Sequence, residues 1–263
     1  MYINYYICVV VDQSAANYDR GNKEMVMNSS LASSFGLTEP VNSNSSGATV
    51  QRVYDDLRRR IISMQLPPDT TLSRAELTDT YQVSQTPIRE AMQLLKQEGL
   101  VRIYPQSKTV VTRIDVPQIH EAHFLRVALE TEVVRRLAVL DNAQLVTRAR
   151  SIIRMQEAVA EDPDQLAVFQ ELDELFHQTL FAGVSRSGLH LLVRERSGHL
   201  DRIRRLHLPE KGKAQGTLAG HVAIVDALAA GSEDGAVKAM RDHLSRTIAK
   251  IEDLRGIYPD YFA

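Results

Sequence analysis

The chain is poor in the features that mark secreted and membrane proteins. Cys8 is the only cysteine among 263 residues, which excludes an intramolecular disulfide framework and fits a reducing compartment. No apolar run approaches the ~20 residues that a membrane-spanning helix needs. The apolar stretch 5–11 is short and lacks the basic start and small-residue cleavage site of a signal peptide. The sequence therefore predicts a cytoplasmic protein with no membrane partner.

Net charge is also small, −2 at pH 7, and by itself indicates no partner. Its distribution is more informative. Residues 49–113 carry 10 Lys and Arg against 7 Asp and Glu, whereas residues 114–263 carry 19 against 22. A mildly basic segment followed by a mildly acidic one is compatible with nucleic-acid binding by the first segment. The length is sufficient for two domains.

The first 48 residues differ in composition from the rest. After the short apolar start they are rich in Asn, Ser and Gly, with little periodicity. We expect residues 1–48 to form a disordered tail. Met25 and Met27 are candidate alternative translation starts within it.

The best-marked helix of the chain begins at Ser84, whose hydroxyl can cap the first turn. Pro87 fits that first turn, and Gly99 fits the left-handed position just past the end. An apolar stripe at helical spacing consists of Ile88, Ala91, Met92, Leu94 and Leu95. The opposite face is polar and cationic, with Gln85, Thr86, Arg89, Gln93 and Lys96. Such a face suits a DNA groove, although most amphipathic helices merely have a solvated polar side.

The segments around this helix decide between the two interpretations. They are a helix over 49–64, a short extended piece at 70–72, a second helix from the capping box Ser73-Arg-Ala-Glu76 to about residue 81, and a hairpin of two β-prone runs, 100–104 and 109–113, around residues 105–108. This order is typical of a winged helix-turn-helix domain, here residues 49–114. The helix from Ser84 then stands in the position of the recognition helix.

Many residues of this segment also stand at the fixed spacing of a known pattern: Val53-Tyr54, Leu57, Ile61, Leu66-Pro-Pro68, Leu72-Ser73, Glu76-Leu77, Val83-Ser84, Thr86-Pro87, Arg89-Glu-Ala91, Leu94-Leu95, Glu98-Gly-Leu-Val101 and Val110. Through them, residues 53–113 resemble the DNA-binding domain of the GntR family of bacterial transcription regulators. The resemblance implies DNA contacts from Arg74, Ser84, Gln85, Thr86, Pro87, Arg89 and Lys108.

Three positions depart from the family pattern. Gln85 stands where the family usually has Arg, and because Gln can bond adenine N6 and N7 we expect a different operator sequence. Ala75 replaces a residue that is basic in some members, with Arg74 one position earlier. Lys108 replaces the usual Gly of the wing tip and can meet a phosphate or reach into the minor groove.

From Asp115 onward the sequence predicts long helices and no strands. The expected helices cover about 115–140, 141–160, 162–181, 187–206, 217–230 and 232–254, with a polar linker at 209–216. Six antiparallel helices can form a bundle with an internal cavity. We therefore expect a mainly α protein whose second domain spans residues 115–256, followed by a tail at 257–263.

Four polar residues in this second domain lie on apolar helix faces. Asp173 and His177 are four residues apart on one predicted helix, and His221 and His243 lie on the last two. Three histidines and a carboxylate from three helices suit a first-row divalent metal of the zinc, nickel or manganese class. Each such histidine alone is more often an ordinary core or surface residue, and spacing does not show that the four converge.

An early Arg126 and Glu130, then Asp173-x-x-x-His177, then His221 and His243 form a second pattern. Through it, residues 119–250 resemble the ligand-binding domain of the FCD subfamily of GntR regulators. The resemblance implies that the Asp and the three His bind metal, with open positions for water or an effector carboxylate. It also places Arg126 and Glu130 among the effector-binding residues.

Two of these effector assignments have alternatives. Arg126 can clamp an organic acid bidentately, or it can form an ordinary i,i+4 pair with Glu130 on a wet helix face. The charged run 201–205 is most simply a solvated face, although Arg202 can also reach the cavity.

Together these features predict a homodimeric transcription regulator rather than an enzyme, either a repressor or an activator, with repression favoured. It would bind a palindromic operator in double-stranded DNA and respond to a small carboxylate metabolite. One alternative is a direct metal sensor that needs no organic ligand. Another is a metal-dependent hydrolase with a vestigial DNA-binding domain, in which the metal cluster activates water.

Overall fold

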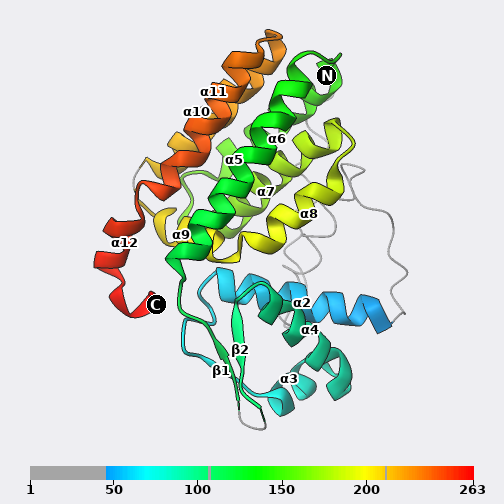
Figure 1. Cartoon of the computed structure of the whole chain (residues 1–263), viewed down its shortest axis with the longest axis vertical. Helices are drawn as coiled ribbons and strands as arrows, with labels where there is room; N and C mark the ends of the chain where they lie inside the picture. Colours follow the sequence, from blue (N-terminus) through cyan, green and yellow to red (C-terminus); the bar gives the residue numbers. More distant parts are fainter. Residues whose placement is uncertain (1–45, 106–107, 211) are drawn as a thin grey trace, which may run out of the picture. The chain divides into compact units, whose positions relative to one another are not determined.

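The computed structural model describes residues 46–105, 108–210 and 212–263. Most of the predicted N-terminal tail, residues 1–45, lies outside the described residues, as do Gln106 and Ser107 of the predicted hairpin loop and Lys211 of the predicted linker. The described chain is mostly helical, with one small antiparallel sheet, as the sequence predicted (Figure 1). No helix in these ranges combines the length and hydropathy needed to cross a bilayer.

The first part is a winged helix-turn-helix domain. Its elements are α2 (Ser46–Ile62), β1 (Thr71–Leu72), α3 (Arg74–Tyr81), α4 (Gln85–Gln97), β2 (Val101–Ile103) and β3 (Thr109–Val111). The strands are ordered β1-β3-β2, with Leu72 opposite Thr109 and Arg102 opposite Val110. Apolar residues from α2, α4 and the wing form one core beneath α4, including Leu57, Ile61, Ile88, Leu95 and Val111.

The ends of α3 and α4 differ in one respect from the prediction. Ser73 caps α3, since its hydroxyl accepts a hydrogen bond from the Glu76 amide, and Gly99 takes the left-handed conformation at φ +77° after α4. Ser84 stands at the N-cap of α4 but makes no capping hydrogen bond with its side chain. Ser84 is exposed at the start of α4.

The second part is all-helical. It consists of α5 (Val116–Ala138), α6 (Ala143–Val159), a 3-10 turn (Pro163–Gln165), α7 (Leu166–Gly183), α8 (Ser187–Arg196), α9 (Gly198–His207), α10 (Lys213–Ala229), α11 (Glu233–Ile248) and α12 (Ile251–Ile257), with a final 3-10 turn (Pro259–Tyr261). The long helices α5, α6, α7, α10 and α11 pack side by side (Figure 1). Their facing sides enclose the polar cluster described below.

Two predicted helices are each divided in two. The stretch 187–206 is interrupted at Ser197, which separates α8 from α9. There the backbone of Gly198 passes so close to Leu100 that an added Cβ would lie 2.9 Å from the Leu100 Cδ2 atom. The stretch 232–254 is likewise interrupted between α11 and α12.

The end of the chain is not a loose tail, contrary to the prediction for residues 257–263. Phe262 is buried and forms a parallel bridge with Ile114, the residue that joins the two domains. The Ile114 amide donates to the Tyr261 carbonyl at 2.7 Å, and the Ala263 amide donates to the Ile114 carbonyl at 3.0 Å. The last residues therefore hold the interdomain connection in place.

Candidate metal centre and DNA-binding face

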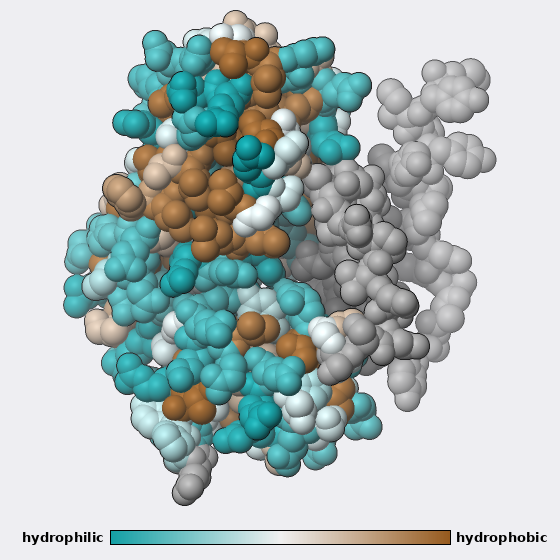
Figure 2. Space-filling model, turned by 45° about the vertical axis from the view of Figure 1, so that its right-hand side comes forward, coloured by the Kyte–Doolittle hydropathy of each residue, from teal (hydrophilic) through white to brown (hydrophobic). Residues whose placement is uncertain are grey.

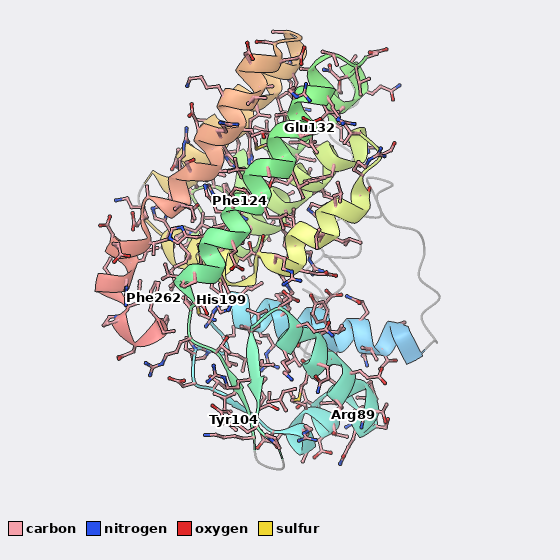
Figure 3. All side chains as sticks on the ribbon, in the orientation of Figure 1. Arg89, Tyr104, Phe124, Glu132, His199 and Phe262 are labelled. Carbon is pink, nitrogen blue, oxygen red and sulfur yellow. The ribbon has the colours of Figure 1, made fainter. Side chains whose placement is uncertain are left out.

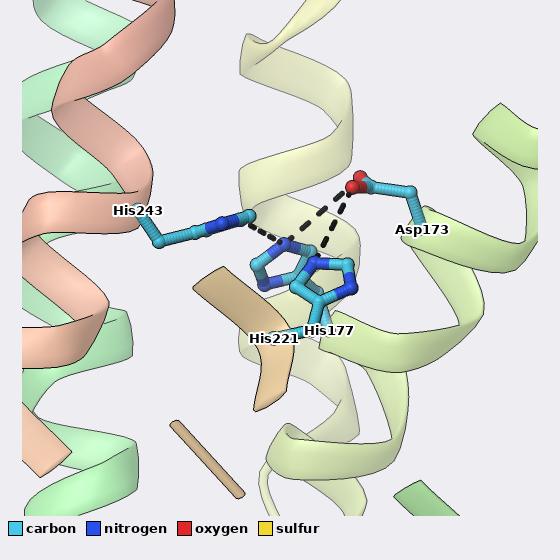
Figure 4. A group of neighbouring side chains, drawn as sticks. All are labelled: Asp173, His177, His221 and His243. Atoms are coloured by element: carbon cyan, nitrogen blue, oxygen red, sulfur yellow. Dashed lines mark hydrogen bonds and ion pairs between the residues drawn. The ribbon is translucent and has the colours of Figure 1, made fainter. Parts of the chain in front are cut away.

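The four predicted ligands converge inside the helical domain. Asp173 and His177 project from α7, His221 from α10 and His243 from α11, and all four are buried. One ligand atom from each lies within 4.8 Å of the others. Figure 4 shows the three imidazole rings and the carboxylate directed at a common space. The sequence could place each residue on an apolar helix face, but only the packing of three helices brings them together.

The local sequence makes room for this convergence. Asp173 and His177 share a face because they are one helical turn apart. Gly220, directly before His221, is buried where α10 meets α11. A Cβ added there would lie 2.6 Å from the His243 Nδ1 atom. The missing side chain therefore lets the His243 ring approach the other ligands.

Two side chains outside the cluster orient the rings. His221 Nδ1 lies 2.8 Å from Gln156 Oε1, and because that oxygen can only accept, Nδ1 carries the hydrogen and Nε2 keeps its lone pair. Glu130 Oε2 lies 2.6 Å from His177 Nδ1 and places a carboxylate directly beside that ring nitrogen. The Nε2 atoms of His177 and His243 lie 3.3 Å apart, facing each other.

The electrostatics of the cluster favour ligation. Burial and the neighbouring histidines hold the pKa values of His221 and His243 well below the ordinary value, so both rings are neutral at pH 7. Burial opposes the charge on Glu130, but Arg126 and His177 together hold its pKa well below the usual range. The acceptor Glu130 therefore stays ionised behind His177.

The donor set fits a divalent metal. Within the described part of the chain, His221 Nε2 and Asp173 Oδ1 are buried without a hydrogen-bond partner, an arrangement that is unfavourable unless something binds there. They lie 3.5 Å apart. Three imidazole nitrogens and one carboxylate oxygen are ligands that zinc and neighbouring first-row ions accept.

A cavity opens beside this cluster. It is lined by His123, Arg126, Phe169, Gln170, Asp173, Leu200, Arg204, Leu208, Lys213, Thr217, His243, Leu244, Arg246 and Thr247. Of the three residues predicted to bind an effector, Arg126 lies on this wall and donates from Nε to Glu130 Oε1 at 2.6 Å. The pair is buried rather than on a wet helix face. Glu130 itself lies behind His177, outside the lining.

The structure contradicts the suggestion that Arg202 reaches this cavity. Arg202 is fully buried at the junction between the domains, where its Nη1 donates to the Thr112 carbonyl at 2.9 Å. Arg204 lines the cavity instead and forms an ion pair with Asp173. The two arginines lie on different sides of α9 because they are two residues apart.

Sequence reasoning also missed His123, Gln156, Lys213 and Arg246. Lys213 was assigned to a linker, although it opens α10. A usable signal existed for Arg246, which follows His243 by three residues and so shares its helix face. Gln156 carried none, because a single Gln on a helix does not indicate which side chain it will meet.

The predicted DNA-contacting residues are exposed, with one exception. Arg74, Ser84, Gln85, Thr86, Arg89 and Lys108 all reach solvent. Pro87 does not, because it is buried, so its side chain is not on the exposed face that the other predicted residues share. Figure 3 shows Arg89 projecting from α4 and Tyr104 on the wing hairpin, and Lys108 Nζ lies 5.8 Å from the centre of the Tyr104 ring.

A second buried polar cluster joins the two domains. The Arg58 guanidinium, from α2, contacts Glu98 Oε2 at 2.8 Å, Asp201 Oδ2 at 3.1 Å and the Arg194 carbonyl at 2.9 Å. Tyr54 donates a hydrogen bond to Glu98 on the other side. We call Tyr54, Arg58, Glu98 and Asp201 the junction network. It connects the C-terminal end of the recognition helix to α9.

Comparisons with known proteins agree with this architecture. Residues 49–111 match the model of the bacterial regulatory proteins of the gntR family, and residues 121–246 match the FCD domain. A helix-turn-helix-type transcriptional regulator from an unstable DNA locus of Streptomyces ambofaciens is 37% identical over 219 residues, covering 82% of this chain and 91% of that protein. This chain belongs to the GntR family of transcription regulators.

Other members of the GntR family are similar over most of their length. The transcriptional repressor RspR of Escherichia coli is 30% identical over 227 residues, covering 86% of this chain and 95% of that protein. Among solved structures, Escherichia coli McbR/YncC aligns with a TM-score of 0.67 at 18% identity, covering 78% of this chain and 98% of that one. That likeness concerns the fold alone.

Proposed function

We propose that this GntR regulator is a repressor whose operator binding is controlled by a small organic acid bound beside a metal in the helical domain. The observation that carries the proposal is the cluster of Asp173, His177, His221 and His243, which has two unsatisfied buried ligand atoms and borders a cavity lined by Arg126. The names of two relatives, RspR and the gluconate operon repressor of Bacillus licheniformis, support repression.

The DNA contacts are assigned to the exposed side of α4 and to the wing. Thr86 and Arg89 lie on one exposed face of the first turns of α4, where they can reach base edges in the major groove. Gln85 can read adenine where arginine would read guanine. Lys108 on the wing and Arg74 at the start of α3 would bind phosphates or the minor groove.

The cavity holds the effector in this proposal. A divalent metal held by the Asp and the three His would supply a Lewis acid for one carboxylate oxygen of the effector. Arg126 would donate to the same carboxylate, and its buried position makes that charge-assisted bond stronger than one at the surface. Glu130 and Gln156 hold the His177 and His221 rings in place.

A homodimer would use the apolar outer side of α5 and α8. Phe124 on α5 is 76% exposed and Leu191 on α8 is 53% exposed, with Leu189 and Leu192 also exposed. The two helices pack against each other, and Figure 2 shows apolar side chains gathered on one face of the helical domain. Large exposed apolar patches often mark protein contacts. A twofold dimer would present two copies of α4 to a palindromic operator.

The junction network is the route by which the cavity would affect α4. Asp201 contacts Arg204 at 3.4 Å on the cavity side and Arg58 at 3.1 Å on the DNA-binding side. Arg58 also holds Glu98, at the end of α4. An effector that moves Arg204 would redistribute these contacts, provided that it binds the two arrangements with different affinity.

The DNA-binding half of the proposal is tested with an operator selected from random DNA by the purified chain. Arg89→Ala should weaken operator binding in a mobility-shift titration by about tenfold or more, because a bidentate base contact contributes roughly 1–3 kcal/mol. Arg241→Ala removes the same charge from an exposed position on α11 in the helical domain and should leave operator binding unchanged. Equal affinity for the wild type and the Arg89 variant would remove α4 from the interface.

The regulatory half is tested by repeating the titration with a chelator and with small organic acids. Operator affinity should change with an organic acid only when metal is present. An affinity that follows metal alone, with no acid able to alter it, would favour the metal-sensor alternative.

A further inference from the structure

We propose that the cavity selects effectors carrying two anionic groups, and that Lys213 and Arg246 bind the second of them. This inference rests on the proposed function, because it assumes that a carboxylate binds at the metal centre. It adds the class of molecule that the site distinguishes, namely dicarboxylates or carboxylic acids with a phosphate or phosphonate group.

Lys213 and Arg246 lie on the same side of the metal centre. Lys213 precedes His221 by eight residues on α10, which is about 12 Å along the helix axis. Arg246 follows His243 by three residues on α11, about 4.5 Å. The two helices are antiparallel, since Arg246 bonds the Gly216 carbonyl and His243 packs on Gly220. Both displacements therefore point the same way, and both cations line the cavity.

The four strong cations of the cavity wall differ in their partners. Arg126 has Glu130, and Arg204 has Asp173 and Asp201. Across residues 46–105, 108–210 and 212–263, no carboxylate lies at ion-pair distance from Lys213 or Arg246. Arg246 is exposed and uses one N–H on the Gly216 carbonyl, which leaves other donors of its guanidinium for a ligand.

The electrostatic potential around Lys213 is dominated by burial and by other cations, even though Glu210 lies nearby. Burial, together with Arg204 and Arg246, lowers the pKa of Lys213 to about 8, although Glu210 opposes the shift. Cations crowded in a partly buried cavity attract an anion more strongly than they would in open solvent. A monocarboxylate seated at Arg126 would leave this second cationic pair without an anion, whereas a dianion of suitable length would satisfy both ends.

The test is isothermal titration calorimetry on the full chain loaded with zinc, with pairs of ligands that differ in one anionic group. The pairs are succinate with butyrate and glutarate with valerate, and 3-phosphonopropionate provides a phosphorus-based dianion. At least one dianion should bind about tenfold more tightly than its monoanionic partner, because one charge-assisted interaction is worth roughly that factor. Comparing the affinities of the dicarboxylates with that of 3-phosphonopropionate then shows whether the site prefers a second carboxylate or a phosphorus-based anion.

Lys213→Met and Arg246→Gln should each reduce this preference severalfold while leaving butyrate and valerate affinity unchanged. Lys238→Met, an exposed lysine elsewhere on α11, is the matched control and should keep the full preference. Retained monocarboxylate binding shows that the variants fold.

Equal binding of the paired ligands by the wild type, or an undiminished preference in the Lys213/Arg246 double variant, would overturn the inference and leave the proposed function standing. Absence of zinc-dependent binding for every acid, mono- or dianionic, would instead count against the proposed function and against this inference with it.

Discussion

The candidate metal centre and the junction network are both buried and both charged, yet they differ in how many of their polar atoms have a partner among the surrounding side chains. In the junction network the Arg58 guanidinium contacts two carboxylates and one carbonyl. In the candidate metal centre, His221 Nε2 and Asp173 Oδ1 have no hydrogen-bond partner among the described residues. In the junction network, side chains of the protein itself pair the Arg58 charge. In the Asp173 and histidine cluster, two buried ligand atoms remain without a partner among the described residues.

Such a difference is expected between buried charges that stabilise a fold and buried charges that bind a ligand. A buried polar group without a partner is costly, so it persists where a ligand or metal restores the lost contact. A buried ion pair with all partners present mainly fixes the geometry around it, and it harms stability when one partner is removed. The two clusters nevertheless share Arg204, which pairs with Asp173 on one side and Asp201 on the other.

The largest effect on stability is expected in the junction network. Arg58→Ala would leave Glu98 and Asp201 as buried carboxylates without their main cation, a loss of roughly 3–5 kcal/mol of unfolding free energy. Urea denaturation of the metal-free chain measures it. Lys238→Ala, which breaks an exposed pair on α11, is the control and should change little. An Arg58 variant as stable as this control would show that the network is not structural.

The largest effect on zinc affinity is expected from the cluster of Asp173 and the three histidines. His221→Ala removes a direct ligand and should lower zinc affinity more than about hundredfold, since losing an outer partner alone costs about 10- to 100-fold. Competition with a chromophoric chelator gives the affinity. His190→Ala, a buried histidine paired with Glu174 at 3.2 Å outside the cluster, should retain wild-type zinc binding. Full affinity in the His221 variant would exclude that residue as a ligand.

A smaller effect should follow from a single methyl group beside the cluster. Gly220→Ala places a Cβ 2.6 Å from the His243 Nδ1 atom, so the ring must move and zinc affinity should fall about tenfold. Gly188→Ala adds the same methyl group where nothing lies within 4 Å and should leave zinc binding intact. If both variants bind zinc like the wild type, the close packing of His243 on α10 does not matter for ligation.

Much of the fold could be predicted from local patterns. The periodicity of apolar residues predicted α2, α4 and most of the bundle helices, and Gly99 marked the end of the recognition helix, because these features depend on neighbours along the chain. The break between α8 and α9 could not be predicted, since it occurs where Gly198 meets Leu100 from the other domain. The packing of Phe262 on Ile114 is likewise a contact between distant segments.

In the candidate site, too, some features could be predicted from the sequence and others depend on the tertiary structure. The sequence by itself determined the types and helix faces of the four predicted ligands, because residues one turn apart must share a face. Only the tertiary structure decided that their atoms come within 4.8 Å, that Arg204 rather than Arg202 reaches the cavity, and that Glu130 stands behind His177. Those outcomes depend on how helices far apart in sequence pack, and no local periodicity encodes which side chains then meet.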